Sequence, residues 1–253
     1  MNTKIQNKIQ KQIKFNQTFG ENTAVYLSGG MDSAIILYHV TEAARDVGKK
    51  IFTYTADFGI EKDECMQAER IANYFGSIHK NVKIDGFYNK LQEILPLFEK
   101  PRFNVWPYFL AEAAKRDACK NIYIGEGSDE IFGGYDNKSY LQAWADSIIY
   151  IMPTFKIIHK YLNLELKAPF YDLDWRYFLG YHLNPNKKFL REAYRSFIPD
   201  FILDAKSRPP AITNYIEFGK KEFPQYFHKI PESQDEARKR INKIVTYLWL
   251  QYQ

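Results

Sequence analysis

The sequence Ser-Gly-Gly-Met-Asp-Ser at residues 28–33 has the residue types and spacing of a phosphate-binding turn. An apolar run of strand character precedes it at residues 24–27, and a helical pattern follows it at residues 34–40. A strand, a glycine turn and a helix N-terminus together present backbone N–H groups and the positive end of the helix dipole to an anion. The turn is not a Walker A loop, because no Gly-Lys-Ser/Thr follows. The segment therefore predicts an anion site, with an ordinary strand-to-helix turn as the alternative.

A second glycine-rich segment, Gly-Glu-Gly-Ser-Asp-Glu-Ile-Phe-Gly-Gly-Tyr, occupies residues 125–135 and follows a short apolar run at residues 121–124. Its four glycines and three carboxylates exclude a place in the core. The segment is either a turn-rich surface loop or a site that holds a cation against a phosphate. Because carboxylates would repel a bare polyphosphate, the second interpretation implies Mg²⁺ between them.

The pattern along the chain predicts an α/β fold with a doubly wound parallel sheet, which would place both glycine-rich segments beyond the carboxyl ends of strands. From residue 137 onward the chain is expected to be mostly helical and to form the other wall of a cleft. A short amphipathic helix is expected near the N-terminus, because Ile5, Ile9 and Ile13 are four residues apart. The expected strands are 23–27, 50–56, 78–84 and 121–124, and the expected helices are 32–47, 61–75, 87–98 and 107–120.

Length and composition favour one globular domain spanning residues 1–253, with the sheet over about 20–135 and a helical part over about 136–253. The net charge of +5 is mild and interleaved with acidic residues, so no nucleic-acid partner is expected. Cys65 and Cys119, both in segments with a helical pattern, indicate neither a disulfide framework nor a zinc site and fit a cytoplasmic protein. No membrane segment is expected.

Residues 28–33 resemble the Ser-Gly-Gly-x-Asp-Ser pyrophosphate loop of enzymes that split ATP between its α and β phosphates. Residues 125–135 are similar to the Ser-Gly-Glu-Gly-Ser-Asp-Glu-x-Phe-Gly-Gly-Tyr segment of asparagine synthetases. The resemblance covers roughly residues 20–215. It implies the PP-loop fold of adenine nucleotide α-hydrolases. It also implies an ATP-dependent, Mg²⁺-dependent amide ligase that activates a carboxylate, aspartate by default, as an acyl-adenylate for attack by ammonia.

The same resemblance assigns roles to residues. Glu126 matches a glutamate beside the reacting centre, proposed to help deprotonate the amine, while Asp32 and Asp129 match carboxylates associated with Mg²⁺ and pyrophosphate. Helix capping by Asp32 and a turn role for Asp129 are the alternatives. The residues expected to bind the nucleotide are Leu27, Ser28, Gly29, Gly30, Asp32, Ser33, Ala56, Gly125 and Lys187, the last at the start of a Lys-x-x-Leu-Arg-Glu pattern.

Three departures from the family pattern bear on catalysis and on the acceptor pocket. The family carries Arg-Pro-Lys where this chain has Arg208-Pro209-Pro210, and we expect Lys206 to replace that lysine, with Arg208 as a supporting cation. The segment at residues 165–172 has Lys167 where the family has arginine, which loses a two-pronged contact to a carboxylate or phosphate. The region before it is shortened relative to the family. The acceptor pocket is therefore expected to differ.

The chain begins Met1-Asn2 and reaches residue 28 before its pyrophosphate loop, so we expect no glutaminase domain with an N-terminal cysteine. Nitrogen would come from free ammonia, a separate glutaminase subunit or another amine. Three alternatives stay open: aspartate as the acid, another acid such as a sugar uronate or a peptide, and a non-catalytic nucleotide-binding subunit. A homo-oligomer is also left open.

Overall fold

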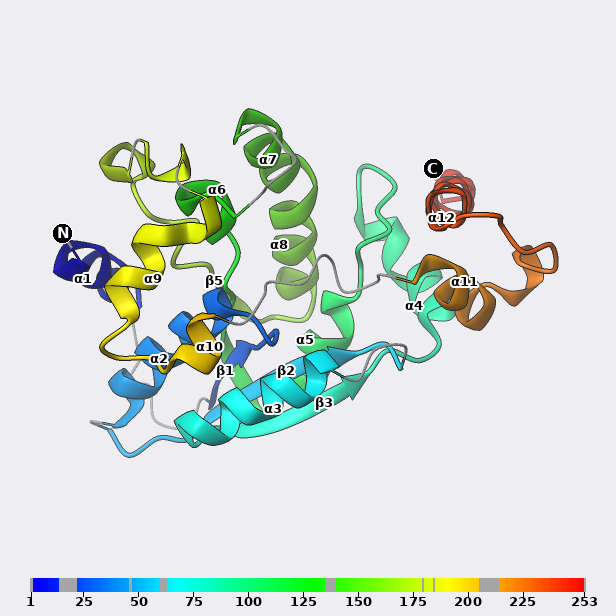
Figure 1. Ribbon diagram of the computed structural model, residues 1–253. Helices are drawn as coiled ribbons and strands as arrows, with labels where there is room; N and C mark the ends of the chain where they lie inside the picture. The colour runs from blue at the N-terminus through cyan, green and yellow to red at the C-terminus, as the bar shows by residue number, and fades with distance from the viewer. Residues whose placement is uncertain are drawn as a thin grey trace.

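The computed structural model describes residues 2–13, 22–45, 47–59, 63–134, 140–178, 180–183, 185–204 and 214–252. Five strands form one parallel sheet in the order β3-β2-β1-β4-β5 (Figure 1). The strands are β1 (Asn22–Tyr26), β2 (Ile51–Asp57), β3 (Ile78–Lys83), β4 (Cys119–Tyr123) and β5 (Glu165–Lys167). The sheet is doubly wound, as expected, and its order reverses between β1 and β4.

Twelve α-helices surround the sheet within the described residues. Together with short 3₁₀ turns and a π-helical turn at Ser147–Ile151, they make the second half of the chain mostly helical, as expected. The helices are α1 (Asn2–Gln12), α2 (Met31–Arg45), α3 (Asp63–Phe75), α4 (Phe87–Ile94), α5 (Pro107–Arg116), α6 (Ser128–Phe132), α7 (Tyr140–Asp146), α8 (Met152–Tyr161), α9 (Lys188–Tyr194), α10 (Asp200–Leu203), α11 (Tyr215–Glu222) and α12 (Gln234–Leu250).

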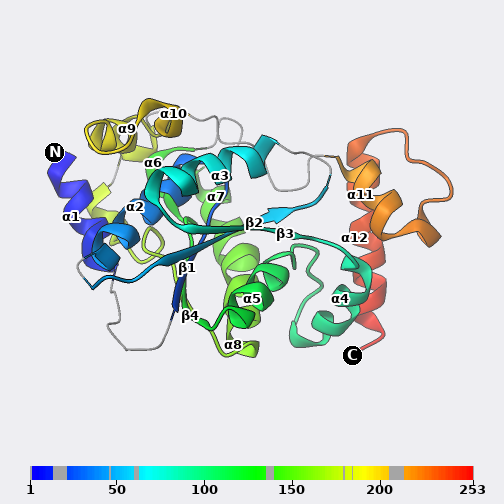
Figure 2. The same cartoon turned by 90° about the horizontal axis from the view of Figure 1, so that it is seen from below.

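The two faces of the sheet are covered by different helices (Figure 2). Helices α1, α2, α3, α9 and α10 lie over one face, and α4, α5 and α8 lie over the other. The core strand β1 is buried over Thr23–Tyr26, as expected for a parallel strand with both faces covered. Helix α2 is buried on most of its sides because it lies between the sheet and α10. These layers fix the position of its N-terminus.

The expected N-terminal helix is confirmed. The side chains of Ile5, Ile9 and Ile13 are buried, and α1 packs on α9, more than 170 residues later in the sequence. This contact helps to hold α9, whose N-terminus carries Lys187, against the body of the protein.

Several element boundaries differ from the expectation, and the expected helix over 87–98 ends as α4 at Ile94. Helix α5 ends at Arg116 and strand β4 begins at Cys119, because Ala118 adopts a left-handed conformation with φ of 55° that breaks the helix. Cys119 therefore lies in a strand and not in a helix. Strand β5, which had no sequence expectation, pairs with β4 over three residues, too few for a periodic pattern to identify.

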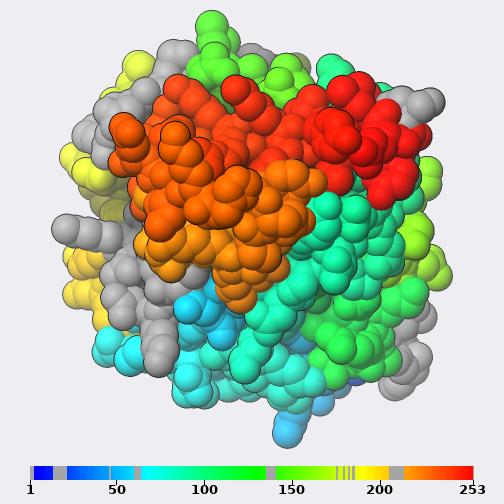
Figure 3. All heavy atoms as spheres, turned by 90° about the vertical axis from the view of Figure 1, so that its right-hand side faces the viewer, coloured from blue at the N-terminus to red at the C-terminus, as the bar shows by residue number. Residues whose placement is uncertain are grey.

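The last two helices, α11 and α12, form one continuous face together with the segment around α4 (Figure 3, orange to red beside cyan-green). The buried Glu222 carboxylate accepts a hydrogen bond from the Phe87 backbone N–H at 2.7 Å. The Trp249 indole N–H donates to the Phe98 carbonyl at 2.9 Å. Among the described residues, none of the helices meets the length and hydropathy that a membrane span requires.

Candidate active site

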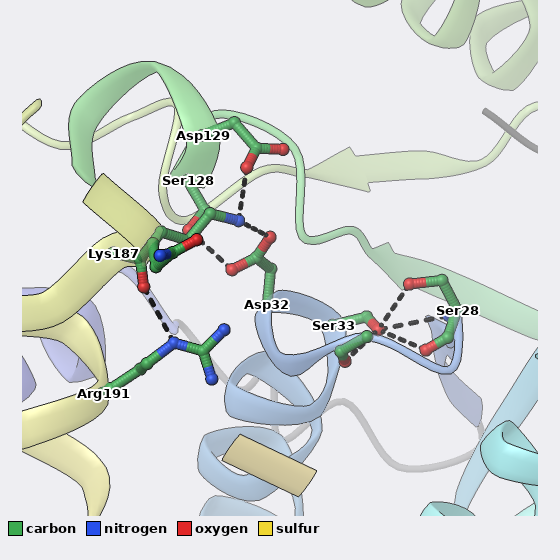
Figure 4. Close-up of polar contacts among 9 residues, drawn as sticks. Ser28, Asp32, Ser33, Ser128, Asp129, Lys187 and Arg191 are labelled. Carbon is green, nitrogen blue, oxygen red and sulfur yellow. Dashed lines mark hydrogen bonds and ion pairs between the residues drawn. The ribbon is translucent and has the colours of Figure 1, made fainter. Parts of the chain in front are cut away.

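The turn at residues 28–33 connects β1 to the N-terminus of α2 at the carboxyl edge of the sheet. The Ser28 backbone N–H donates to the Ser33 hydroxyl at 3.1 Å, and that hydroxyl donates to the Ser28 carbonyl at 3.0 Å (Figure 4). The Ser33 hydroxyl therefore joins the two ends of the turn by hydrogen bonds. The first N–H groups of α2 have no partner within the helix and face the same edge, which is the arrangement expected for an anion site.

Residue 29 is a glycine because α3 approaches the turn closely, and not because the backbone there has an unusual conformation. Neither Gly29 nor Gly30 has a positive φ. A Cβ atom added to Gly29 would lie 3.0 Å from the Gln67 Cβ and 3.2 Å from the Glu64 carbonyl oxygen, both on α3. Helix α3 thus packs directly on the loop.

The acidic loop at residues 124–134 follows β4 and includes the short helix α6, and it lies against the turn that follows β1. A Cβ atom on Gly125 would be 2.8 Å from the Ser33 backbone nitrogen, and one on Gly127, whose φ is 97°, would be 2.7 Å from the Tyr171 nitrogen. The loop is therefore clamped between the first turn of α2 and the segment after β5. Both glycine-rich segments converge at the point where strand order reverses, which is where ligands bind in open α/β sheets.

Asp32 and Asp129 come together around one cation, the Lys187 ammonium (Figure 4). The Asp129 Oδ1 atom lies 2.5 Å from Lys187 Nζ, and Asp32 Oδ2 forms a shorter ion pair with the same nitrogen. The other oxygen of Asp32 accepts a hydrogen bond from the Ser128 hydroxyl at 2.8 Å. Burial opposes the charge of Lys187, but attraction to Asp32 and Asp129 outweighs it and raises the pKa of the ammonium.

Ser128 lies inside the second motif, but its residue type gives no specific signal of a role in the site. The cluster of Asp32, Ser128, Asp129 and Lys187 could not be assembled from sequence, because nothing local in the sequence relates the start of α9 to the start of α2.

Glu126 lies between the two clamped glycines; the residue as a whole is half-buried, and its carboxyl group is enclosed by the fold. Burial within the fold, followed by the negative charges of Glu130, Asp129 and Asp32, raises the pKa of its carboxyl to about 8. Such a carboxyl exchanges a proton near neutral pH, whereas an ordinary glutamate is fully ionised there. This is the property that a general base for an incoming amine requires.

The three residues expected near adenosine lie at the ends of neighbouring strands. Leu27 follows β1, Ala56 lies near the end of β2, and Gly125 follows β4. The Leu27 side chain is buried in the core on the side of α2, so only its backbone faces the edge of the sheet, where its N–H donates to the Tyr54 carbonyl at 2.9 Å. The Ala56 side chain is partly exposed.

Other residues singled out in the sequence form contacts other than those with Asp32 and Asp129, or fall outside the described part of the chain. Lys206 and Arg208 lie outside the described residues. Lys167 forms an ion pair with Glu165 at 2.8 Å. Arg191 donates from Nε to the Asn186 carbonyl at 2.8 Å and lies 3.6 Å from Asp204, so it joins α9 to the end of α10.

The donor set at the carboxyl edge suits Mg²⁺ held jointly by protein and phosphate. Among the described residues no group of three or more His, Cys, Asp or Glu side chains could hold a metal ion by itself. Asp32 and Asp129 are two carboxylates that already share one cation. Mg²⁺ in nucleotide sites is commonly bound by one or two carboxylates together with substrate phosphates, so these residues fit the expected ion.

Comparison with solved structures agrees with the described topology. The U34-tRNA thiolase NcsA from Methanococcus maripaludis superposes with a TM-score of 0.52 at 15% identity, over 96% of this chain and 79% of that chain. This likeness concerns the fold, which is the PP-loop type that the sequence predicts.

Sequence comparison identifies the family. Asparagine synthetase [glutamine-hydrolyzing] 1 of Arabidopsis thaliana is 26% identical over 67% of this chain and 32% of its own length. The amidase chry2 of Gibberella zeae is 32% identical over 45% of this chain and 19% of its own length. The chain thus spans a third or less of these curated relatives. The asparagine synthase family profile matches residues 5–167, which is more than half of the chain and includes both glycine-rich motifs. This chain belongs to the asparagine synthase family.

Proposed function

We propose that this protein is an ATP-dependent, AMP-forming amide ligase of the asparagine synthetase type. The observation that carries the proposal is the convergence of Asp32 and Asp129 on one cation position, directly beside the anion-binding start of α2. This arrangement supports binding of a nucleotide phosphate chain by N–H groups on one side and by carboxylate-held Mg²⁺ on the other. Mg²⁺ held by Asp32 and Asp129 would neutralise the leaving pyrophosphate.

The first step forms an acyl-adenylate. An oxygen of the substrate carboxylate bonds to the α-phosphorus of ATP, the bond from that phosphorus to the bridging oxygen breaks, and pyrophosphate leaves with its electron pair. The N–H groups at the start of α2 stabilise the charge on the leaving phosphates. We expect Lys206, with Arg208, to add positive charge there, as the family resemblance implies.

The second step forms the amide. Ammonia attacks the acyl carbon, the bond to the adenylate oxygen breaks, and AMP leaves. The attacking nitrogen must lose a proton, and we assign its acceptance to the Glu126 carboxylate, whose pKa of about 8 suits a base near neutral pH. Glutamine-hydrolysing relatives support ammonia as the nitrogen donor, either free or from a separate glutaminase.

Aspartate is the first acid to test, and Lys167 favours testing others. Its ammonium is paired with Glu165, so it is less available to a substrate carboxylate than the arginine of the family pattern. Two relatives named amidases, chry2 and chyE, point in the same direction. A sugar uronate, a peptide or a biosynthetic acid is therefore the second candidate substrate.

The decisive experiment measures pyrophosphate release from Mg-ATP with aspartate and with a panel of other carboxylic acids, each with ammonium, with glutamine and without a nitrogen source. Aspartate-dependent release, with asparagine formed only when ammonium is added, supports the first substrate. Release that requires another acid supports the second. ATP binding without release for any acid contradicts the ligase proposal and favours a non-catalytic nucleotide-binding subunit.

A matched pair of variants connects the assay to the site. Asp32→Asn keeps the shape of the side chain but removes its charge, and we expect at least about a hundredfold slower pyrophosphate release, the scale of losing a main electrostatic contact in a transition state. Asp235→Asn makes the same change on α12, where Asp235 pairs with exposed Arg238 and Lys239. That variant should retain the wild-type rate. Equal rates in both variants would contradict the role of Asp32.

A further inference from the structure

The Lys187 ammonium occupies the position between two carboxylates that a divalent cation would take. The Lys187 side chain is only 5% exposed, and its Nζ atom contacts both Asp32 and Asp129 (Figure 4). These are the two residues assigned to the metal. One buried lysine therefore neutralises half of the negative charge of the two carboxylates.

The backbone around Lys187 is built to deliver this side chain. Lys187 and Asn186 both adopt left-handed conformations, with φ of 52° and 58°, which are unfavourable for residues other than glycine. The Lys187 N–H bonds to the Gly133 carbonyl at 3.4 Å, and Arg191 holds the Asn186 carbonyl. The strained turn is thus fastened at both ends and directs the lysine from the start of α9 toward α6.

The packing around Gly134 is independent evidence that the structure holds Lys187 beside Asp129. A Cβ atom added there would lie 1.5 Å from the Asp129 Oδ1 atom and 2.6 Å from the Lys187 Cε atom. The Asp129–Lys187 pair occupies space that only a glycine leaves open, although Gly134 has no positive φ. Close packing of the ion pair therefore accounts for this glycine of the second motif.

We propose that Lys187 is an internal counter-ion that prevents Asp32 and Asp129 from binding a divalent metal in the absence of nucleotide. The two ionised carboxylates and the Lys187 ammonium together carry a net charge of −1. A divalent ion that joined the same oxygens would lie within a few ångströms of the ammonium, and the repulsion in this buried setting would be strong. Metal and lysine therefore exclude one another until additional negative charge arrives.

Given the proposed function, the phosphates of ATP supply that charge. They can accept the lysine ammonium while the carboxylates take the metal, so Mg²⁺ enters together with the nucleotide. Lys187 is in this sense a positioning residue that couples metal binding to substrate binding. The exclusion of a metal in the absence of nucleotide depends only on the contacts among Asp32, Asp129 and Lys187, whereas the coupling to ATP also rests on the proposed function.

The test is a titration of the full chain with Mn²⁺ in the absence of nucleotide. The concentration of free Mn²⁺ is measured at each step from its electron paramagnetic resonance signal. Lys187→Gln removes the charge while leaving a side chain that can donate hydrogen bonds to both carboxylates. Lys188→Gln is the matched control, because the exposed Lys188 lies one residue away and has only a 3.9 Å contact with Glu192. We expect Lys187→Gln to bind Mn²⁺ at least about tenfold more tightly than the wild type and the control.

A second measurement, the melting temperature with and without Mg²⁺, is needed because Lys187→Gln could also lower the stability of the fold. Mg²⁺ should raise the melting temperature of Lys187→Gln, since a ligand that binds only the folded state stabilises it, and should leave the wild type unchanged. Adding Asp129→Asn to Lys187→Gln should abolish both effects. Wild-type protein that binds Mn²⁺ as tightly as Lys187→Gln overturns the proposal, as does a variant that stays unfolded at saturating Mn²⁺.

These measurements contain no nucleotide or acid substrate. Their outcome is therefore separate from that of the pyrophosphate-release assay: failure of the ligase proposal leaves the metal-binding difference to stand or fall by itself.

Discussion

Replacing Gly125 by alanine tests the contact between the two glycine-rich loops. The added Cβ atom would lie 2.8 Å from the Ser33 nitrogen and 3.1 Å from the Asp32 carbonyl carbon, whereas ordinary contacts begin near 3.4 Å. The obstructing atoms are backbone at the first turn of α2, so relief requires a relative shift of about 0.6 Å between that turn and the acidic loop. We expect a loss of about 1–3 kcal/mol in the free energy of unfolding, the usual cost of overpacking.

The same shift moves Asp32 away from Asp129. Because misplacement of reacting groups by about 1 Å can cost a hundredfold in rate, we expect Gly125→Ala to release pyrophosphate about tenfold more slowly or worse. Urea unfolding and the pyrophosphate assay measure the two effects. Gly48→Ala is the control, because a Cβ atom there meets nothing within 4 Å. Because a φ of 64° is unfavourable for alanine, Gly48→Ala should lose about 1–2 kcal/mol of stability and keep the wild-type rate. Wild-type stability and rate for Gly125→Ala would refute the packing argument.

Two further predictions concern Glu126 and the C-terminal helices. Glu126→Gln should slow amide formation but not the exchange of pyrophosphate into ATP, and it should remove the rise in wild-type amide formation with pH through about 8, where Glu126 becomes the carboxylate. Because the pKa of Glu126 is higher in the folded than in the unfolded state, the wild type loses stability as the pH rises toward 8. Glu126→Gln should therefore melt at a higher temperature than the wild type above pH 8. The reverse order would contradict the burial of this carboxyl. Glu222→Gln weakens the bond to the Phe87 N–H and should cost about 1.5–3 kcal/mol in urea unfolding, whereas Glu217→Gln, at an exposed pair with Lys220, should cost less than about 1 kcal/mol. Equal costs for these two variants would show that Glu222 does not anchor α11 to α4.

Most of the sheet could be predicted because its signals are local. The apolar run before Ser28 and the helical pattern after Ser33 identify β1 and α2 directly, and the spacing of later runs identifies β2, α3 and β3. Where the hydrophobic pattern was short or irregular, the ends of an element or the element itself could not be predicted. The end of α5 depends on the conformation of Ala118, and the three residues of β5 are a strand only because β4 lies beside them.

The candidate site was predictable in its parts. Asp32, Glu126 and Asp129 stand in motifs whose composition points to phosphate and metal chemistry, and the parallel sheet places both motifs at one edge. The raised pKa of Glu126 was not available from the sequence, because it depends on burial and on three neighbouring carboxylates. Ser128 could not be predicted as part of the site, because a serine in a glycine-rich loop carries no specific signal.

Short contiguous patterns in the sequence are enough to indicate the family, the doubly wound sheet and the two loops at its carboxyl edge. The position of Lys187 between Asp32 and Asp129 follows only from the folded structure, because 155 residues separate Lys187 from Asp32. The space that Gly134 leaves for this pair is likewise a property of the fold. These contacts depend on how α9 folds back over α2 and α6, and the packing of distant segments leaves no periodic pattern in the sequence from which it could be inferred.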